Sequence, residues 1–154
     1  MRGRYMSSSN HSSDYAGDLD AEEAWALLKS DPNAQLVDVR TMPEWTFVGG
    51  PDLSSLERPV HGIEWQVFPS MAPNPDFVTQ TRAALGDAGA NKDSPILFLC
   101  RSGARSRAAA IALTRAGYSR AYNVAGGFEG DMDENRHRGN RNGWKAAGLP
   151  WRQS

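Results

Sequence analysis

The stretch "PILFLCRSGARSRAAAIALTRAG", residues 95–117, joins a strand pattern to a helix pattern and decides the fold class. Its first six residues form a continuous apolar run, which is typical of a strand covered on both faces in a parallel sheet. From residue 106 onward the apolar spacing is helical, and Gly117 is the expected cap. A strand and a helix joined by a short glycine-containing loop form one βα unit of an α/β fold. Two adjoining stripes carry the apolar side chains of the helix: Ala108, Ile111 and Ala112, and beside them Ala109, Leu113 and Ala116.

Two more segments have strong helix signals. In "LDAEEAWALLKSDPNA", Asp20 is the predicted N-cap, Glu23 completes a capping box, and Asp31-Pro32 ends the helix. In residues 75–89 the apolar side chains recur near helical spacing, and a glycine is the expected stop. Both segments are expected to cover a sheet.

Short apolar runs bounded by turn residues predict the other strands. Residues 35–40 ("QLVDVR") suit a buried strand, and residues 120–127 ("RAYNVAGG") suit another that ends at a glycine turn. Residues 41–75 are interrupted by glycines and prolines, so loops and short turns are predicted there, with one strand at "IEWQV". The alternation predicts an α/β fold, with a mainly parallel central sheet flanked by helices in a single domain.

Composition excludes several classes of protein. The chain has 154 residues, of which 40% are hydrophobic, which suits one domain with a sizeable core. Lys plus Arg number 17 against 18 Asp plus Glu, so the chain lacks the basic excess expected for nucleic-acid or anionic-membrane binding. No segment has the roughly 20 apolar residues that span a bilayer, and the polar start lacks the apolar centre of a secretory signal. A cytoplasmic protein without nucleic-acid or membrane partners is expected.

The chain contains one cysteine and three scattered histidines. One cysteine cannot form an internal disulfide, and no Cys/His group has zinc-ligand spacing. No structural metal and no cofactor are therefore expected. The histidines are interpreted as ordinary surface or turn residues.

The single cysteine, Cys100, lies where the apolar run meets the loop. Open α/β folds bind ligands at the carboxyl ends of their strands, so Cys100 is expected to face a pocket. Gly103 allows the backbone to curl, so that the amides of residues 101–105 point inward as an anion-binding nest at a helix N-terminus. This field, with Arg101 and Arg105 nearby, is expected to lower the pKa of the Cys100 thiol and make it a nucleophile. The alternative is that Cys100 is one more small apolar side chain in a buried strand.

Three motifs resemble those of the rhodanese family. "CRSGARS" (100–106) resembles its active-site loop, whose pattern is Cys-Arg-x-Gly-x-Arg or Thr followed by Ser. "LVDVRTMPEW" (36–45) resembles its early strand and turn, and "NVAGGFEGD" (123–131) resembles its late glycine turn. The matches lie in the family's order and span about residues 20–131. Together they identify the chain as a rhodanese-like domain.

The resemblance implies a sulfurtransferase that works in two steps through a covalent intermediate. The cysteine would take the outer sulfur of thiosulfate or another persulfide donor and pass it from a persulfide to cyanide or a thiol, a protein thiol included. A monomer is expected. The residues implied are Cys100 as the nucleophile, Arg101, Ser102, Gly103, Ala104 and Arg105 as the substrate-binding loop, and Asp38, Arg40 and Ser106 as supporting residues.

Several of these residues have a structural alternative. Asp38 and Arg40 fit a structural salt bridge at least as well as substrate contact. Arg105 fits a residue that ties down the loop through carboxylate or backbone bonds. Glu44 is interpreted as a capping or loop-tying residue, and Trp45 as a core residue.

Two other functions stay open. The related cell-cycle phosphatases have a Cys-x5-Arg loop, whereas Arg105 lies one residue nearer the cysteine and gives Cys-x4-Arg. The shorter ring fits a sulfane sulfur better than an oxyanion, which disfavours a phosphatase or an arsenate reductase. The second alternative is a non-catalytic rhodanese-like binding module. The intact Cys100 argues against it, since such modules commonly lack the cysteine.

Three segments are predicted along the chain. Residues 1–17 lack periodicity and are predicted to be a disordered leader, residues 18–131 form the rhodanese-like domain, and residues 132–154 form a C-terminal extension that packs on it. Trp144 and Trp151 are hypothesised to anchor this extension near the mouth of the pocket, because their rings need burial. The alternative is a solvated basic loop with an ordinary packed terminus.

Overall fold

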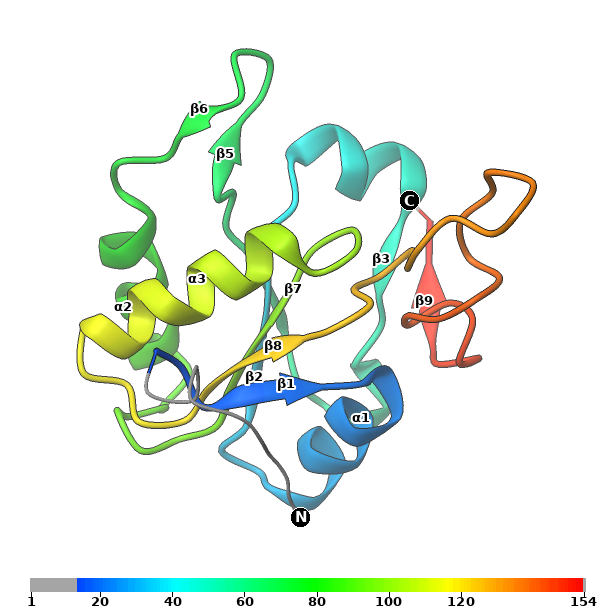
Figure 1. Ribbon diagram of the computed structural model, residues 1–154. Helices are drawn as coiled ribbons and strands as arrows, with labels where there is room; N and C mark the ends of the chain where they lie inside the picture. The colour runs from blue at the N-terminus through cyan, green and yellow to red at the C-terminus, as the bar shows by residue number, and fades with distance from the viewer. Residues whose placement is uncertain (1–13, 154) are drawn as a thin grey trace.

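The computed structural model describes residues 14–153 (Figure 1). Most of the predicted leader, residues 1–13, lies outside the described residues. The end of that leader was placed too late, because Tyr15 is 2% exposed and Gly17 begins the first strand. The Tyr15 ring packs in the core, and its hydroxyl donates a hydrogen bond to Asp18 at 2.8 Å.

A central sheet consists of β1 Gly17–Leu19, β2 Gln35–Asp38, β4 Val60–Gly62, β7 Ile96–Leu99 and β8 Ala121–Val124. Its five strands lie in the order β1-β8-β7-β2-β4, and each neighbouring pair is parallel. Val37 of β2 pairs with Phe98 of β7, which in turn pairs with Asn123 of β8. The predicted α/β fold with a mainly parallel sheet is confirmed.

Helices cover both faces of this sheet: α1 Ala21–Ser30 on one, and α2 Phe77–Asp87 with α3 Ala104–Arg115 on the other (Figure 1). Because successive strand residues point to opposite faces, the strands divide the core in two. Val37 and Phe98 join the cluster that contains α2 and α3. Leu36 and Leu97 join the cluster that contains α1.

Helix α1 begins and ends where the sequence predicts. The Asp20 carboxylate accepts the amide of Glu23 at 2.7 Å, and the Glu23 carboxylate accepts the amide of Asp20 at 2.9 Å. The helix stops before Asp31. This reciprocal cap satisfies two donors that a helix N-terminus otherwise leaves unpaired.

Helix α3 buries the stripe that contains Ala109 and Leu113, together with Ala110. These small side chains let the helix lie close to β7 and β8, so the loop before it is held tightly against the sheet edge. Ile111 on the other predicted stripe is half-buried.

The region between β2 and α2 is where the predicted strand was misplaced. Residues 60–62 form β4 in the central sheet, whereas "IEWQV" contributes only β5, Gln66–Val67, to a separate hairpin with β6, Ala72–Pro73. Strand β4 pairs with β2 alone, and its residues include His61 and Gly62, so it lacks the apolar pattern of a buried strand. The rest comprises a π-helical turn η2 at Glu44–Val48, β3 at Gly50–Pro51 and a 3-10 turn η3 at Ser54–Leu56.

The C-terminal segment packs on the α1 side of the sheet. Strand β9, Trp151–Arg152, pairs antiparallel with β3 (Figure 1). Trp144 is fully buried, and its indole N–H donates to the carbonyl of Pro150 at 2.7 Å. Trp25 of α1 meets it edge to face, with ring centroids 5.9 Å apart. Trp144 therefore anchors this segment in the core, whereas residues 145–153 are half-buried or exposed. A lid function for the segment stays a prediction.

Candidate active site

The thiol lies at the carboxyl end of β7, where the chain turns into α3. Gly103 is the N-cap of α3 and has φ +119°, a backbone conformation that residues other than glycine rarely adopt. This turn brings the amide of Gly103 to within 3.1 Å of Cys100 Sγ, to which it donates a hydrogen bond. The predicted curl of the loop is present. Of the predicted amide nest, this N–H is the one bonded to the sulfur.

A chain of polar side chains continues from the sulfur into the sheet. Ser106 Oγ lies 3.2 Å from Cys100 Sγ and donates to Oδ1 of Asn123 at 2.6 Å. The Asn123 amide nitrogen donates to Asp18 at 3.0 Å, and the Tyr15 hydroxyl donates to the same carboxylate oxygen. This chain of hydrogen bonds therefore runs from the thiol across β8 to β1.

Asn123 was not identified from the sequence as a site residue. It is 4% exposed in the middle of β8, where an apolar residue is usual. The signal was available, since a buried asparagine inside a strand needs hydrogen-bond partners. Its partners, Ser106 and Asp18, come from distant segments that local patterns do not connect.

Cys100 was expected to face a pocket, whereas the residue is 1% exposed in this structure. It packs in the cluster with Val39 and Ala109, which is the alternative that the sequence left open. Its sulfur is nevertheless not surrounded by apolar groups alone, since an amide and a hydroxyl contact it. Beside the thiol, Arg101 is exposed.

The late glycine turn holds the loop from behind. The amide of Phe128 donates to the carbonyl of Cys100 at 2.8 Å, and the amides of Glu129 and Gly130 both donate to the carbonyl of Arg101 at 3.0 Å. A Cβ at Gly127 would lie 2.5 Å from the Cys100 carbonyl oxygen. The glycine therefore permits a close approach that no other residue allows without a shift.

Arg105 is bound to Glu44 rather than free beside the thiol. Its two terminal nitrogens lie 2.8 and 3.0 Å from the two carboxylate oxygens of Glu44, a bidentate pair. The hydrogen bond to Glu44 is the main cause that raises the pKa of Arg105. The sequence placed Arg105 in the substrate-binding loop as a cation near the thiol, but its charge is already paired with Glu44. The loop-tying alternative describes what is observed.

Glu44 has the loop-tying role that was inferred for it. Besides Arg105, it accepts the amide and the hydroxyl of Thr41, at 3.0 and 2.9 Å. Burial raises its pKa, but the hydrogen bonds from Arg105 and Thr41 outweigh burial and lower it to about 2. The turn that follows β2 is thus fastened to the start of α3.

Asp38 and Arg40 form a buried structural salt bridge. Arg40 donates to the Asp38 carboxylate at 2.7 and 2.9 Å, donates to the carbonyl of Gly49 at 2.8 Å, and lies over the Phe128 ring at 4.5 Å. The pair therefore connects the end of β2 to the glycine turn. Neither side chain forms a hydrogen bond or an ion pair with Cys100.

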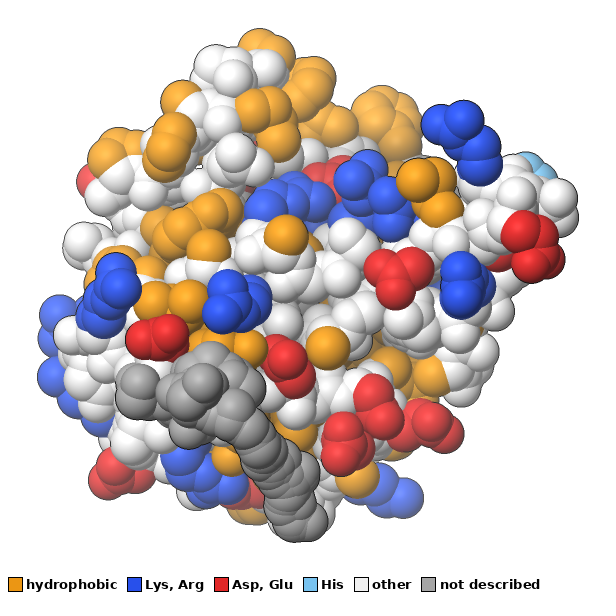
Figure 2. All heavy atoms as spheres, in the orientation of Figure 1, with side chains coloured by type: hydrophobic (Ala, Val, Ile, Leu, Met, Phe, Trp, Pro, Cys, Tyr) orange, Lys and Arg blue, Asp and Glu red, His pale blue; other side chains and the backbone are white. Residues whose placement is uncertain are grey.

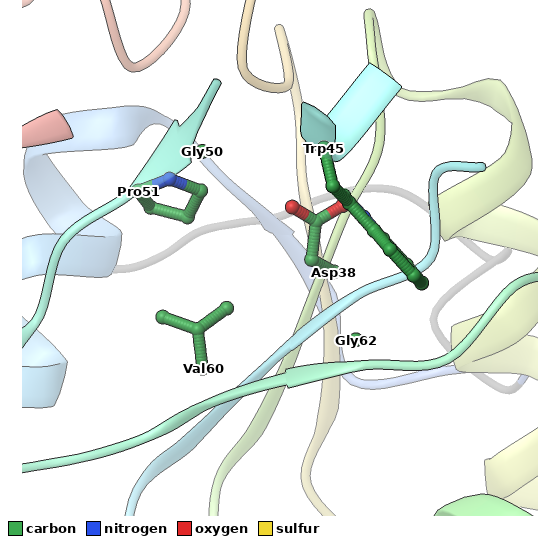
Figure 3. A pocket seen from close by; sticks show the side chains of 6 residues that line it. All are labelled: Asp38, Trp45, Gly50, Pro51, Val60 and Gly62. Carbon is green, nitrogen blue, oxygen red and sulfur yellow. The ribbon is translucent and has the colours of Figure 1, made fainter. Parts of the chain in front are cut away.

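A small cavity lies beside Asp38 (Figure 3). It has a volume of about 220 Å³ and is lined by Asp38, Trp45, Gly50, Pro51, Val60 and Gly62. Trp45 was expected in the core, but it is half-buried and forms one wall of this cavity, with its ring against Gly62.

His61 lies away from the thiol, with Nε2 2.9 Å from Gln35 Oε1, and burial lowers its pKa. Within residues 14–153, no group of three or more His, Cys, Asp or Glu side chains is arranged to hold a metal ion. In the same part of the chain, no helix is long and apolar enough to cross a membrane.

The match to known families covers almost the whole described chain. The family model of the STR4 middle domain matches residues 16–154. The chain belongs to the STR4 middle domain family. An uncharacterized protein of Rickettsia conorii is 38% identical over 129 residues, which cover 84% of this chain and 91% of that protein.

Two further comparisons extend to named sulfurtransferases. Thiosulfate sulfurtransferase GlpE of Actinobacillus succinogenes is 28% identical over 133 residues, 86% of this chain and 87% of that protein. The solution structure of the polysulfide-sulfur transferase homodimer of Wolinella succinogenes is 22% identical, with a TM-score of 0.57 over 93% of this chain and 82% of that one. This likeness shows the fold, which is rhodanese-like.

The crystal structure of Rv0390 from Mycobacterium tuberculosis is nearer in sequence. It is 47% identical, with a TM-score of 0.80, and the match covers 91% of this chain and 99% of that one. The family and the fold therefore rest on matches over most of the chain and not on the loop motif alone.

Proposed function

We propose that this protein is a sulfurtransferase that carries a sulfane sulfur on Cys100. The observation that carries the proposal is the position of Cys100 Sγ at a strand-to-helix turn, where the Gly103 amide and the Ser106 hydroxyl contact it. The Gly103 amide donates a hydrogen bond that a sulfur anion can accept, and the N-terminus of the 12-residue helix α3 adds its dipole. The similarity to thiosulfate sulfurtransferase GlpE supports this chemistry.

The proposed reaction has two balanced steps. The Cys100 thiolate attacks the outer sulfur of thiosulfate, the S–S bond breaks, and sulfite leaves with the electron pair. A persulfide remains on Cys100. Cyanide or a thiolate then attacks the outer sulfur, so that thiocyanate or a new persulfide leaves and the Cys100 thiolate is restored. No oxidant, metal or cofactor enters either step.

Access to the sulfur requires the loop to move, because Cys100 is 1% exposed. Residues 101–104 form the outer side of the turn, with Arg101 and Ala104 exposed. We assign Arg101 as the cation that attracts an anionic donor, since Arg105 is paired. Ser102, Gly103 and Ala104 then supply the backbone that surrounds the transferred sulfur.

The substrates proposed are thiosulfate or another persulfide donor, with cyanide or a thiol as acceptor. The sequence contains one cysteine, so a second thiol for an internal relay is absent. A monomer located in the cytoplasm stays the expectation from the sequence.

The test is thiocyanate formation from thiosulfate and cyanide. Wild-type protein should turn over with the parallel-line kinetics of a covalent intermediate, and Cys100→Ser should be inactive. Hydrolysis of an aryl phosphate by the wild type, without thiocyanate formation, would instead indicate an oxyanion enzyme.

A further inference from the structure

Five large apolar side chains are exposed on segments that neighbour the thiol loop, residues 100–104. Met42 and Phe47 come from the segment around η2, and Val67, Phe68 and Met71 come from the β5–β6 hairpin. Phe47 is 76% exposed, Met42 62% and Phe68 54%. Figure 2 shows apolar side chains gathered over this hairpin at the top of the molecule. We call these five residues the apolar rim.

Three residues of the apolar rim, Met42, Phe47 and Phe68, line a hollow of about 330 Å³. Its walls are Met42, Pro43, Thr46, Phe47, Glu64 and Phe68. The Glu64 carboxylate accepts the amide of Met42 at 3.0 Å, so the two segments are held together. Exposed apolar surface of this kind marks interaction sites, and methionine side chains adapt to varied partners.

The sheet topology places the apolar rim beside the thiol. The segment with η2 follows β2, the segment with the hairpin follows β4, and the thiol loop follows β7. Because β4, β2 and β7 are neighbouring parallel strands, all three segments leave the same edge of the sheet. The Glu44–Arg105 pair joins η2 directly to the start of α3. A partner seated on the rim therefore reaches the loop.

Charge narrows the choice of partner. Figure 2 shows Lys and Arg side chains directly below the apolar patch, over the loop between β7 and α3, where Arg101 is exposed. Glu64 in the hollow repels a small anionic donor, and such a donor gains nothing from contact with the apolar walls. The surface thus fits an apolar group next to an acidic group, with the latter near the loop.

We propose that the apolar rim docks the sulfur acceptor, a protein whose cysteine lies between apolar side chains and an acidic residue. This inference rests on the proposed sulfurtransferase function. The acceptor thiolate attacks the outer sulfur of the Cys100 persulfide, and a bond forms between the two sulfurs. The bond from that outer sulfur to Cys100 Sγ breaks. Its electron pair stays on Sγ, so that Cys100 becomes a thiolate again. No other reactant is needed.

The test uses persulfide-loaded protein and synthetic peptide thiols as probes. One peptide has leucines and an aspartate around its cysteine, and the matched peptide has serines and a lysine; glutathione is the small thiol. The wild type should transfer sulfur to the apolar acidic peptide about tenfold faster than to the matched peptide. In Phe47→Ser combined with Phe68→Ser, this preference should fall to within about twofold. The rate with glutathione should not change.

Met132→Ser is the matched control, because Met132 is an exposed apolar residue outside the rim, at 43% exposure. It should keep the full preference. If loading and discharge by glutathione are intact but both peptides react equally in the wild type, the docking inference is overturned and the proposed function stands. If no persulfide forms, the proposed function itself fails, and the inference with it.

Sedimentation tests two other possible occupants of the apolar rim, a second copy of this chain and a membrane. The wild type should remain a monomer and should not bind vesicles of anionic phospholipid. A dimer that the double serine variant dissociates would show that a second copy covers the rim, and vesicle binding that the same variant abolishes would show that a membrane does. Either result overturns the inference.

Discussion

The pair between Glu44 and Arg105 should contribute measurably to stability, and Glu44→Gln tests this. The pKa of Glu44 is lowered from 4.5 to about 2, which corresponds to about 3 kcal/mol of stability if all of it is retained. The two side chains are 18% and 20% exposed, and solvent on that side screens the pair. We therefore expect the free energy of unfolding at neutral pH to fall by about 1–2 kcal/mol in the variant.

The pH dependence follows from the direction of the shift. Because the pKa of Glu44 is lower in the folded than in the unfolded protein, its contribution is complete above about pH 4.5 and is lost as the pH falls toward about 2. The difference between wild type and variant should thus be constant from about pH 7 to pH 5 and fall below about half of that by pH 3.

Urea unfolding across this pH range measures the difference, and Glu134→Gln, an exposed carboxylate in the C-terminal segment, is the control. The control should match the wild type throughout. A Glu44 variant as stable as the wild type at neutral pH would refute the reasoning, as would a difference that stays unchanged down to the acid end.

Three further predictions concern the packing around the thiol, each measured by urea unfolding. Gly127→Ala should destabilise by more than about 3 kcal/mol, because Gly127 has φ +62° and a Cβ would lie 2.5 Å from a backbone carbonyl oxygen of the thiol loop. Gly139→Ala, at φ +92° with open space around its Cβ, should cost only about 1 kcal/mol, and equal costs would contradict the close approach. Trp144→Ala should lower the free energy of unfolding by about 3–5 kcal/mol, because the ring is fully buried. Trp151→Ala should lower it by less than half as much, because Trp151 is 38% exposed. The reverse order would be inconsistent with the packing of the C-terminal segment. Ser106→Ala leaves a buried amide oxygen without its donor and should cost about 1–3 kcal/mol, so an unchanged stability would argue against the hydrogen-bond chain.

Local sequence patterns predicted the helices and strands whose determining residues lie within the element itself. The capping box at Asp20 and Glu23 fixed the start of α1, and the apolar run before Cys100 predicted β7. Both depend on residues within a few positions of one another. Strand β4 was missed because its place in the sheet comes from pairing with β2. In that pairing Val60 lies opposite Leu36, which is 24 positions earlier in the sequence.

The candidate site shows the same division. The position of Cys100 at a strand-to-helix turn followed from the sequence, but its near-complete burial did not, because the cover comes from packing of distant segments. The pairing of Glu44 with Arg105 joins residues 61 positions apart, and that of Ser106 with Asn123 joins residues 17 apart. Such contacts exist only once the sheet has brought the segments together.

The most direct test of sulfur transfer is the intact mass of the protein after incubation with thiosulfate and removal of the excess. The wild type should gain the mass of one sulfur atom, located on Cys100 by peptide mapping, and cyanide should remove it with release of thiocyanate. Cys100→Ser should gain nothing. A wild-type mass that stays unchanged, or an added sulfur that cyanide cannot remove, would contradict the assignment of Cys100 as the sulfur carrier.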